Sequence, residues 1–115
     1  MEDSMYPEWT PELQRKREQL APASSAAFKA FGEAVFADGA LDAKTKELIA
    51  VAVAHVTQCP YCIRGHTRRA LRKGATQEEV MEAIWVAAEM RAGGAYAHSV
   101  LALDAMSEHP DGDTS

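Results

Sequence analysis

The sequence contains little cysteine, few aromatic side chains and no long apolar run. Two of the 115 residues are cysteines, and 7% are aromatic. No stretch of about 18 uninterrupted apolar residues occurs, which excludes a membrane-spanning helix. Residues 1–14 also lack the basic and apolar regions of a signal peptide. We therefore expect a cytoplasmic protein with no membrane partner, where two neighbouring cysteines are more typical of catalysis or metal binding than of a permanent disulfide.

Basic residues are also in deficit. The chain has 12 lysines and arginines against 17 acidic residues, a net charge of -5. A nucleic-acid-binding protein normally needs a concentrated basic face that neutralises phosphates. We therefore expect no nucleic-acid partner, and the negative charge suits solubility.

Alanine is abundant in the sequence, and the patterns that are present are those of helices. Alanine accounts for 22 residues, and no alternation of polar and apolar residues is long enough for a convincing strand. The interior must therefore be built from close helix contacts, and we predict an all-α fold of five to six helices. A single domain of this length leaves a large fraction of its surface exposed, so a partner subunit would help to stabilise it.

Capping residues and glycines predict where the helices begin and end. We expect helices from Pro11 to about Leu20, from Ser24 or Ser25 to Asp38, after Asp42, from Pro60 to Lys73, and after a capping box at Thr76 and Glu79, with Gly93-Gly94 breaking or bending the chain before a last helix.

Apolar patterning predicts the core. The stretch "ELIAVAVAHV" has so few polar positions that we expect most of this central helix to be buried. Three residues at helical spacing are expected in the core: Phe28, Phe31 and Val35. Among alanines further on, Trp85, Tyr96 and His98 are expected in the core or at a subunit interface.

The chain divides into an arm, a domain and a tail. Residues 1–23 are expected to form an N-terminal arm with a short helix, which docks on the chain's own core or on a neighbouring subunit. Residues 24–107 are expected to form the helical domain. Residues 108–115 are predicted to be a mobile polar tail.

The stretch "TQCPYCIRGH" carries the candidate chemistry. If Pro60 is the first helical residue, Cys59 is the N-cap, and Cys62 and His66 lie within about 60° of it on one helix face. The partial positive charge of a helix N-terminus should depress the pKa of the cysteine pair. A thiolate, a second thiol and an imidazole are the minimum set for reducing a peroxide or exchanging a disulfide.

Glu47 precedes the apolar run of the central helix, where burying a carboxylate is costly unless it has a partner. His66 is the natural candidate. A glutamate bonded to this imidazole would fix its tautomer and raise its basicity. The simpler interpretation is an acid in the first turns of a helix, where it suits the helix dipole.

A metal site is the main rival to a redox site. His55, Cys59, Cys62 and His66 supply four zinc-competent ligands within twelve residues. Structural zinc sites usually draw two ligand pairs from separated elements, so we favour His55 as an ordinary helix-end or interface histidine and expect no metal. A cluster of basic residues follows the cysteines. We interpret it as a solvated helix face rather than an anion-binding site, although Arg69 lies on the cysteine side and could attract an acidic reductant. The cluster comprises Arg64, Arg68, Arg69, Arg72 and Lys73.

The spacing of these residues resembles a known signature. It reads Glu47, eleven residues, Cys59-Pro60-Tyr61-Cys62, three residues and His66. This is similar to the alkylhydroperoxidase D-like proteins within the carboxymuconolactone decarboxylase family, and the resemblance covers residues 41–104. It implies an all-α fold that assembles into homotrimers or homohexamers, and a thiol peroxidase activity without metal, flavin or haem.

The resemblance also implies roles for the residues. Cys62 would be the peroxidatic thiol that becomes a sulfenic acid, Cys59 the resolving thiol at which an external reductant enters, and Glu47 and His66 a proton relay. Helix electrostatics alone would instead favour Cys59 as the more acidic thiol. Tyr61 departs from those family members that carry histidine between the cysteines.

The substrate implied by the resemblance is an organic hydroperoxide or hydrogen peroxide. The reductant would be a dihydrolipoamide-type carrier, a thioredoxin-like protein or a small thiol. Two alternative functions stay open: a lactone decarboxylase of the same family, and a zinc-stabilised helical interaction module.

Overall fold

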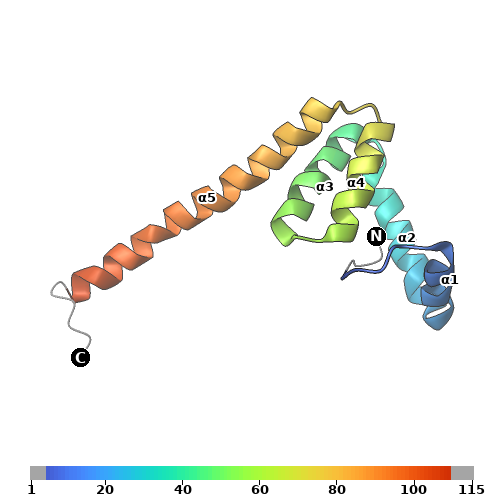
Figure 1. Cartoon of the computed structure of the whole chain (residues 1–115), viewed down its shortest axis with the longest axis horizontal. Coiled ribbons are helices and arrows are strands. Elements are labelled where there is room, and N and C mark those ends of the chain that lie inside the picture. Colours follow the sequence, from blue (N-terminus) through green and yellow to red (C-terminus); the bar gives the residue numbers. More distant parts are fainter. Residues whose placement is uncertain (1–4, 110–115) are drawn as a thin grey trace.

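The computed structural model describes residues 5–109 and contains five helices in this range, with no strand. Figure 1 shows them in chain order: α1 (Pro11–Leu20), α2 (Pro22–Phe36), α3 (Ala43–Thr57), α4 (Pro60–Arg72) and α5 (Gln77–Glu108). The predicted all-α fold is therefore confirmed. No helix within residues 5–109 is long and apolar enough to cross a membrane.

The predicted caps set the helix starts. The side chains of Thr10 and Asp42 accept hydrogen bonds from backbone N–H groups three residues on, at the starts of α1 and α3. Thr76 and Glu79 form the complete capping box of α5. Helix α2 begins at Pro22, slightly earlier than predicted, because proline is tolerated in a first helical turn.

Helix α5 passes through Gly93-Gly94 without interruption, so the predicted break and the separate last helix are wrong. Each glycine costs a helix only about 1 kcal/mol relative to alanine, and the neighbours Ala92 and Ala95 are strong helix formers. The helix continues through Glu108. The rest of the predicted tail, residues 110–115, lies outside the described residues.

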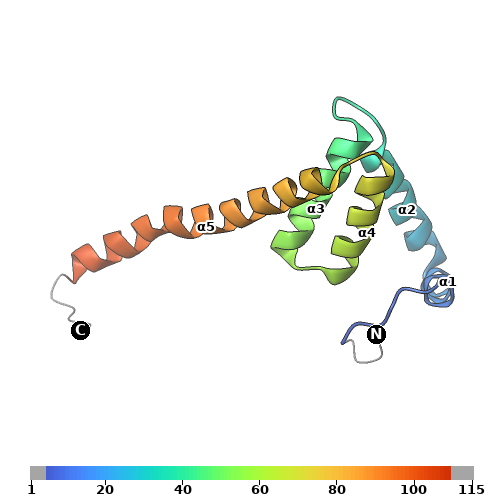
Figure 2. The same cartoon turned by 45° about the horizontal axis from the view of Figure 1, so that its top comes forward.

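The helices form a small head and a long projection. Helices α3 and α4 run side by side, the first part of α5 packs on α3, and the rest of α5 extends away from the head (Figures 1 and 2). Helices α1 and α2 lie on the side of the head away from the projecting part of α5 (Figure 1). The radius of gyration is 20.3 Å, whereas a compact domain of this length would have about 13 Å.

The buried core is small and is made mainly of alanine. Val51 on α3 is fully buried, and Leu48 and Ile84 pack around the core cluster. The expectation that most of the α3 circumference is buried is wrong, since Ile49 and Val53 are about half exposed. The buried apolar residues are Ala43, Val51, Ala54, Ala70, Ala75, Val80 and Ala87.

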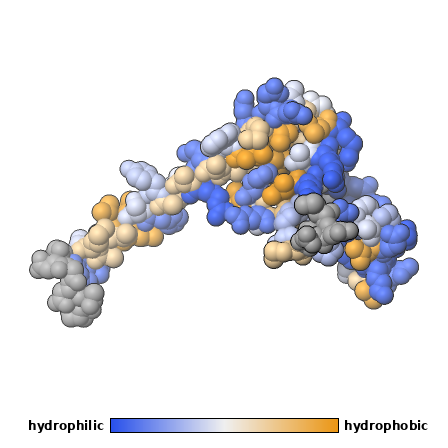
Figure 3. Space-filling view, in the orientation of Figure 1, coloured by the Kyte–Doolittle hydropathy of each residue, from blue (hydrophilic) through white to orange (hydrophobic). Residues whose placement is uncertain are grey.

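The aromatic residues do not form the core. Phe28 and Phe31 on α2 are 75% and 63% exposed, and Trp85 and Tyr96 on α5 are 68% and 83% exposed. The prediction that Phe28 and Phe31 lie in the core is therefore wrong. For Trp85 and Tyr96 the core alternative is wrong, and a subunit interface stays a prediction. Figure 3 shows apolar residues at the surface of both the head and the projecting part of α5. In the single chain most of the surface of these side chains is therefore uncovered.

Candidate redox site

The cysteine pair sits at the turn between α3 and α4. Gln58 adopts a left-handed conformation with a φ of 58° and reverses the chain after α3. Cys59 then caps α4, as predicted, and Pro60 occupies the first helical turn. The Cys59 Sγ accepts a hydrogen bond from the backbone N–H of Cys62 at 3.3 Å. Both cysteines are partly buried and unbridged.

The two thiols have opposite pKa shifts. The pKa of Cys59 is lowered, first by the hydrogen bond from the Cys62 side chain and then by the backbone N–H of Cys62. The pKa of Cys62 is raised by the same side-chain hydrogen bond, by burial and by the nearby Cys59 charge. The prediction that both thiols are acidified is therefore wrong for Cys62, because the hydrogen bond between the two side chains stabilises the Cys59 thiolate, and the charge of that thiolate opposes a second one.

These shifts predict different alkylation profiles. A thiol reacts as its thiolate, so a lowered pKa moves reactivity to lower pH and a raised pKa moves it to higher pH. Iodoacetamide labelling across pH, followed by mass spectrometry, should therefore modify Cys59 at a pH where Cys62 is still inert. A peptide of residues 57–66 is the unfolded control, in which the two profiles should coincide. Coincident profiles in the folded protein would contradict the assignment.

Glu47 and His66 form a buried hydrogen-bonded pair. The Glu47 carboxylate on α3 is 3% exposed, and its Oε1 lies 2.7 Å from Nδ1 of His66 on α4. The predicted contact between Glu47 and His66 is thus present. A glutamate that only matched the dipole at the start of α3 would have no need to be buried. If Nδ1 donates its proton to the carboxylate, Nε2 is the basic nitrogen of the imidazole.

Two further residues contact the imidazole, and neither contact was predicted from the sequence. The ring of Phe36, the last residue of α2, stacks on His66 with centroids 5.2 Å apart. Arg69 Nη1 lies 3.5 Å from His66 Nδ1, and its positive charge partly offsets the raised pKa of Cys62. The spacing of Arg69 placed it on the cysteine side, but no pattern in the sequence links Phe36 to α4.

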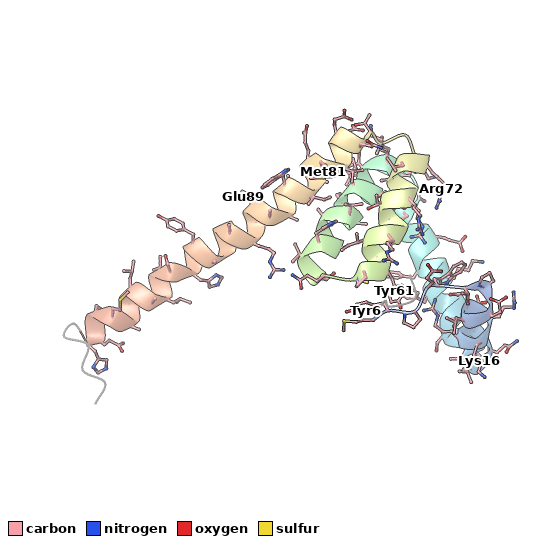
Figure 4. All side chains as sticks on the ribbon, viewed as in Figure 1. Tyr6, Lys16, Tyr61, Arg72, Met81 and Glu89 are labelled. Carbon is pink, nitrogen blue, oxygen red and sulfur yellow. The ribbon has the colours of Figure 1, made fainter. Side chains whose placement is uncertain are left out.

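Residues 5–9, which belong to the predicted N-terminal arm, contact Tyr61, the second of the two residues between the cysteines. The Tyr61 hydroxyl donates a hydrogen bond to the Pro7 carbonyl at 2.6 Å, and the Tyr6 ring meets the Tyr61 ring edge-on with centroids 6.0 Å apart. Figure 4 shows these two tyrosines together at the start of α4. This part of the arm therefore lies against the CxxC turn.

His55 is not part of the site. Its Nδ1 lies 2.7 Å from the Val51 carbonyl on its own helix. Within residues 5–109, no three side chains of the metal-binding types converge on one point. The structure thus presents two hydrogen-bonded pairs on α4, namely Cys59 with Cys62 and His66 with Glu47. Helix periodicity puts both pairs on the same side of α4.

Comparison with known proteins finds related chains that match the region containing this site. The model of the carboxymuconolactone decarboxylase family matches residues 22–105, a span that includes Glu47, both cysteines and His66 but not residues 5–9. A Paracoccus denitrificans protein named "Uncharacterized protein 4 in cox locus" is 68% identical over 82 residues, which cover 71% of this chain and 74% of that one.

Solved structures share the fold. A carboxymuconolactone decarboxylase family protein from Legionella pneumophila superposes with a TM-score of 0.67 at 37% identity, covering 84% of this chain and 87% of that one. A Thermotoga maritima protein of the same family, for which involvement in an antioxidative response has been suggested, has a TM-score of 0.54 at 28% identity over 71% of this chain and 94% of its own.

Proposed function

We propose that this chain, which belongs to the carboxymuconolactone decarboxylase family, is a thiol-dependent peroxidase that cycles Cys59 and Cys62 between dithiol and disulfide. The buried Glu47–His66 pair on the helix that carries the dithiol is the observation that supports this most strongly. The antioxidative role suggested for the Thermotoga relative points the same way. We also propose a reducing compartment such as the cytoplasm, where a neighbouring cysteine pair is more typical of catalysis than of a permanent disulfide.

The first step forms a sulfenic acid. The Cys62 sulfur attacks one oxygen of an organic hydroperoxide or of hydrogen peroxide, and the O–O bond breaks. Because the pKa of Cys62 is raised, its thiol needs a base, and His66 takes the proton and passes it to the leaving alkoxide. Glu47 stabilises the imidazolium formed on the way. The products are the Cys62 sulfenic acid and an alcohol, or water.

The second step forms the disulfide. Cys59, whose lowered pKa keeps it a thiolate, attacks the sulfenic sulfur, the S–O bond breaks, and the hydroxyl leaves as water with a proton relayed by His66. An external thiol reductant then enters at Cys59 and restores the dithiol. The cycle needs no metal, flavin or haem, because sulfur carries both electrons.

A thiol count tests this function directly. Protein is treated with one equivalent of an organic hydroperoxide, and its free thiols are counted by mass spectrometry before and after. The expected result is the loss of two thiols per chain with formation of one alcohol per peroxide. Thiols that stay unreacted would end the peroxidase proposal and favour lactone chemistry or metal binding, which metal analysis and a muconolactone assay then separate.

We also propose that the chain works as a homo-oligomer, a trimer or hexamer. Its accessible surface is 9250 Å², about 3,000 Å² more than a compact monomer of this mass would have. Excess of that size matches the area that obligate subunits bury. The exposed apolar residues of α2 and of the projecting part of α5 are the surfaces that a second copy would cover.

Charging the projecting part of α5 should therefore dissociate the assembly. Val100 and Leu101 are 64% and 66% exposed in the chain, and in an interface a carboxylate there would be buried without a partner. We expect Val100→Glu with Leu101→Glu to shift the mass by light scattering from oligomer to monomer. Glu82→Lys, an exposed position nearer the head, is the control. An unchanged mass in the double variant would contradict this interface.

A further inference from the structure

Charge is strongly segregated along the chain. Residues 48–77 contain no aspartate or glutamate but five lysines and arginines, whereas the rest of the chain has seven basic and 17 acidic residues, a net charge of -10. All five cations lie on α4 or at its C-cap, Lys73. The helix that begins with the dithiol is thus the one strongly positive element within residues 5–109.

Four arginines form a continuous exposed surface, which we call the basic ridge. Arg64, Arg68 and Arg72 follow one another at intervals of four, so they lie within about 80° on the helix and span about 12 Å along it. Arg69 flanks them on the side of His66. All four are exposed, and within residues 5–109 none is within ion-pair distance of a carboxylate.

One end of the ridge reaches the N-terminal turn of α4. Tyr61, the second of the two residues between the cysteines, lies in the same sector of α4, about 180° from the buried Ala70. Around the helix, Cys62 lies next to Arg69 at the edge of the ridge, and Cys59 lies on the opposite side. Figure 4 shows Tyr61 at one end of this helix and Arg72 near the other. A molecule that lies along the ridge would therefore have one end at the CxxC turn.

We propose that the basic ridge is the docking surface for an acidic protein that carries a dithiol and reduces the Cys59–Cys62 disulfide. This rests on the proposed function and names the kind of reductant. One partner thiolate attacks a sulfur of the disulfide, forming a mixed disulfide and releasing the other cysteine as thiolate. The partner's second thiol then breaks the mixed disulfide. Two electrons and two protons pass to this chain, and the partner leaves as a disulfide.

An acidic protein fits the ridge better than other anions. Nucleic acid would meet four arginines on one short helix but also the net negative charge of the rest of the chain, which repels phosphates. A small anion needs donors that converge, whereas a helix side is convex and its arginines diverge. An acidic protein face can spread several carboxylates along about 12 Å and gains attraction that steers its encounter.

The experiment compares synthetic dithiol peptides that differ only in charge. Each carries a Cys-Gly-Pro-Cys core, flanked by glutamates in one and by glutamines in the other, and dithiothreitol serves as the uncharged small reductant. The protein is first oxidised to the disulfide with diamide, so the test works even if the chain does not reduce peroxides. The second-order rate of disulfide reduction is measured in low and in high salt.

The glutamate peptide should react at least about 10-fold faster than the glutamine peptide in low salt, and this ratio should collapse in high salt. Arg68→Glu with Arg72→Glu should abolish the ratio, while the dithiothreitol rate stays the same. Lys16→Glu with Lys29→Glu, which makes the same change in net charge at exposed positions of α1 and α2, should keep it.

Three results would overturn the proposal. A ratio that survives in the arginine variant would place the attraction elsewhere. A change in the oligomer mass of that variant would assign the ridge to contact between copies of this chain. Salt-sensitive binding of a single-stranded oligonucleotide that is tighter than binding of the glutamate peptide would assign the ridge to nucleic acid.

Discussion

Cys62→Ser should not reduce organic hydroperoxides at all, whereas Cys59→Ser should consume one equivalent and then stop. Removing Cys62 deletes the sulfur that attacks oxygen, and a serine hydroxyl cannot replace a thiolate at neutral pH. Removing Cys59 leaves the attack intact but deletes the thiolate that would resolve the sulfenic acid. Turnover with an excess of reductant should fall to background in both variants, and only Cys59→Ser should give a burst.

Trapping the sulfenic acid with dimedone and locating it by mass spectrometry assigns the order of attack. The adduct should appear on Cys62 in Cys59→Ser, and the double variant is the blank. The alternative is that Cys59 attacks the peroxide first, since its lowered pKa makes it the more available thiolate. An adduct on Cys59 in Cys62→Ser, with a burst of equal size, would show that Cys59 attacks first and that the roles in the proposed cycle are reversed.

The site was predictable to the extent that it depends on local geometry. Cys59 as an N-cap follows from Pro60 alone, and helix periodicity puts Cys62 and His66 on one face. The Glu47–His66 contact followed from the cost of burying a lone carboxylate. The opposite pKa shifts of the two thiols did not follow, because they arise from the hydrogen bond between the sulfurs rather than from the helix dipole that both share.

The errors in the predicted fold have two sources: hydrophobicity was taken to indicate the core of one chain, and a local helix propensity was taken to decide where a helix ends. Phe28 and Phe31 were assigned to the core by their hydrophobicity, but a sequence pattern does not distinguish the core of one chain from the interface between chains. Gly93-Gly94 was predicted to break the helix because glycine has a low helix propensity. Helix propensity is a weak local term, and the α5 backbone continues through two glycines that lie among alanines.

Phe36 shows which kind of site residue escapes a sequence reading. It ends α2, a helix that otherwise makes little contact with the head, and its half-buried ring covers one face of the His66 imidazole. That contact depends on how α2 meets α3 and α4, which no local pattern in the sequence contains. The site is thus built from three helices, of which only α3 and α4 carry its motif.

Glu47→Gln should slow peroxide reduction by about 10- to 100-fold while the fold stays intact, as expected when the carboxylate behind a functional histidine loses its charge. Glutamine has nearly the same shape, and its carbonyl oxygen can still accept the proton of His66 Nδ1. Only the stabilisation of the imidazolium is lost, so the effect should fall on the sulfenic acid step and not on peroxide affinity. Single-turnover kinetics at several peroxide concentrations separate these two quantities.

A second glutamate in the same chain gives the matched control for Glu47→Gln. Glu79 caps α5 and pairs with Lys44 at 2.9 Å, away from His66. Glu79→Gln should lower the melting temperature slightly and leave the single-turnover rate unchanged. Glu47→Gln should instead slow the single-turnover rate and leave the iodoacetamide profile of Cys59 unchanged. If Glu47→Gln loses stability but keeps its rate, the buried carboxylate only holds α3 against α4, and proton transfer from Cys62 must use another base.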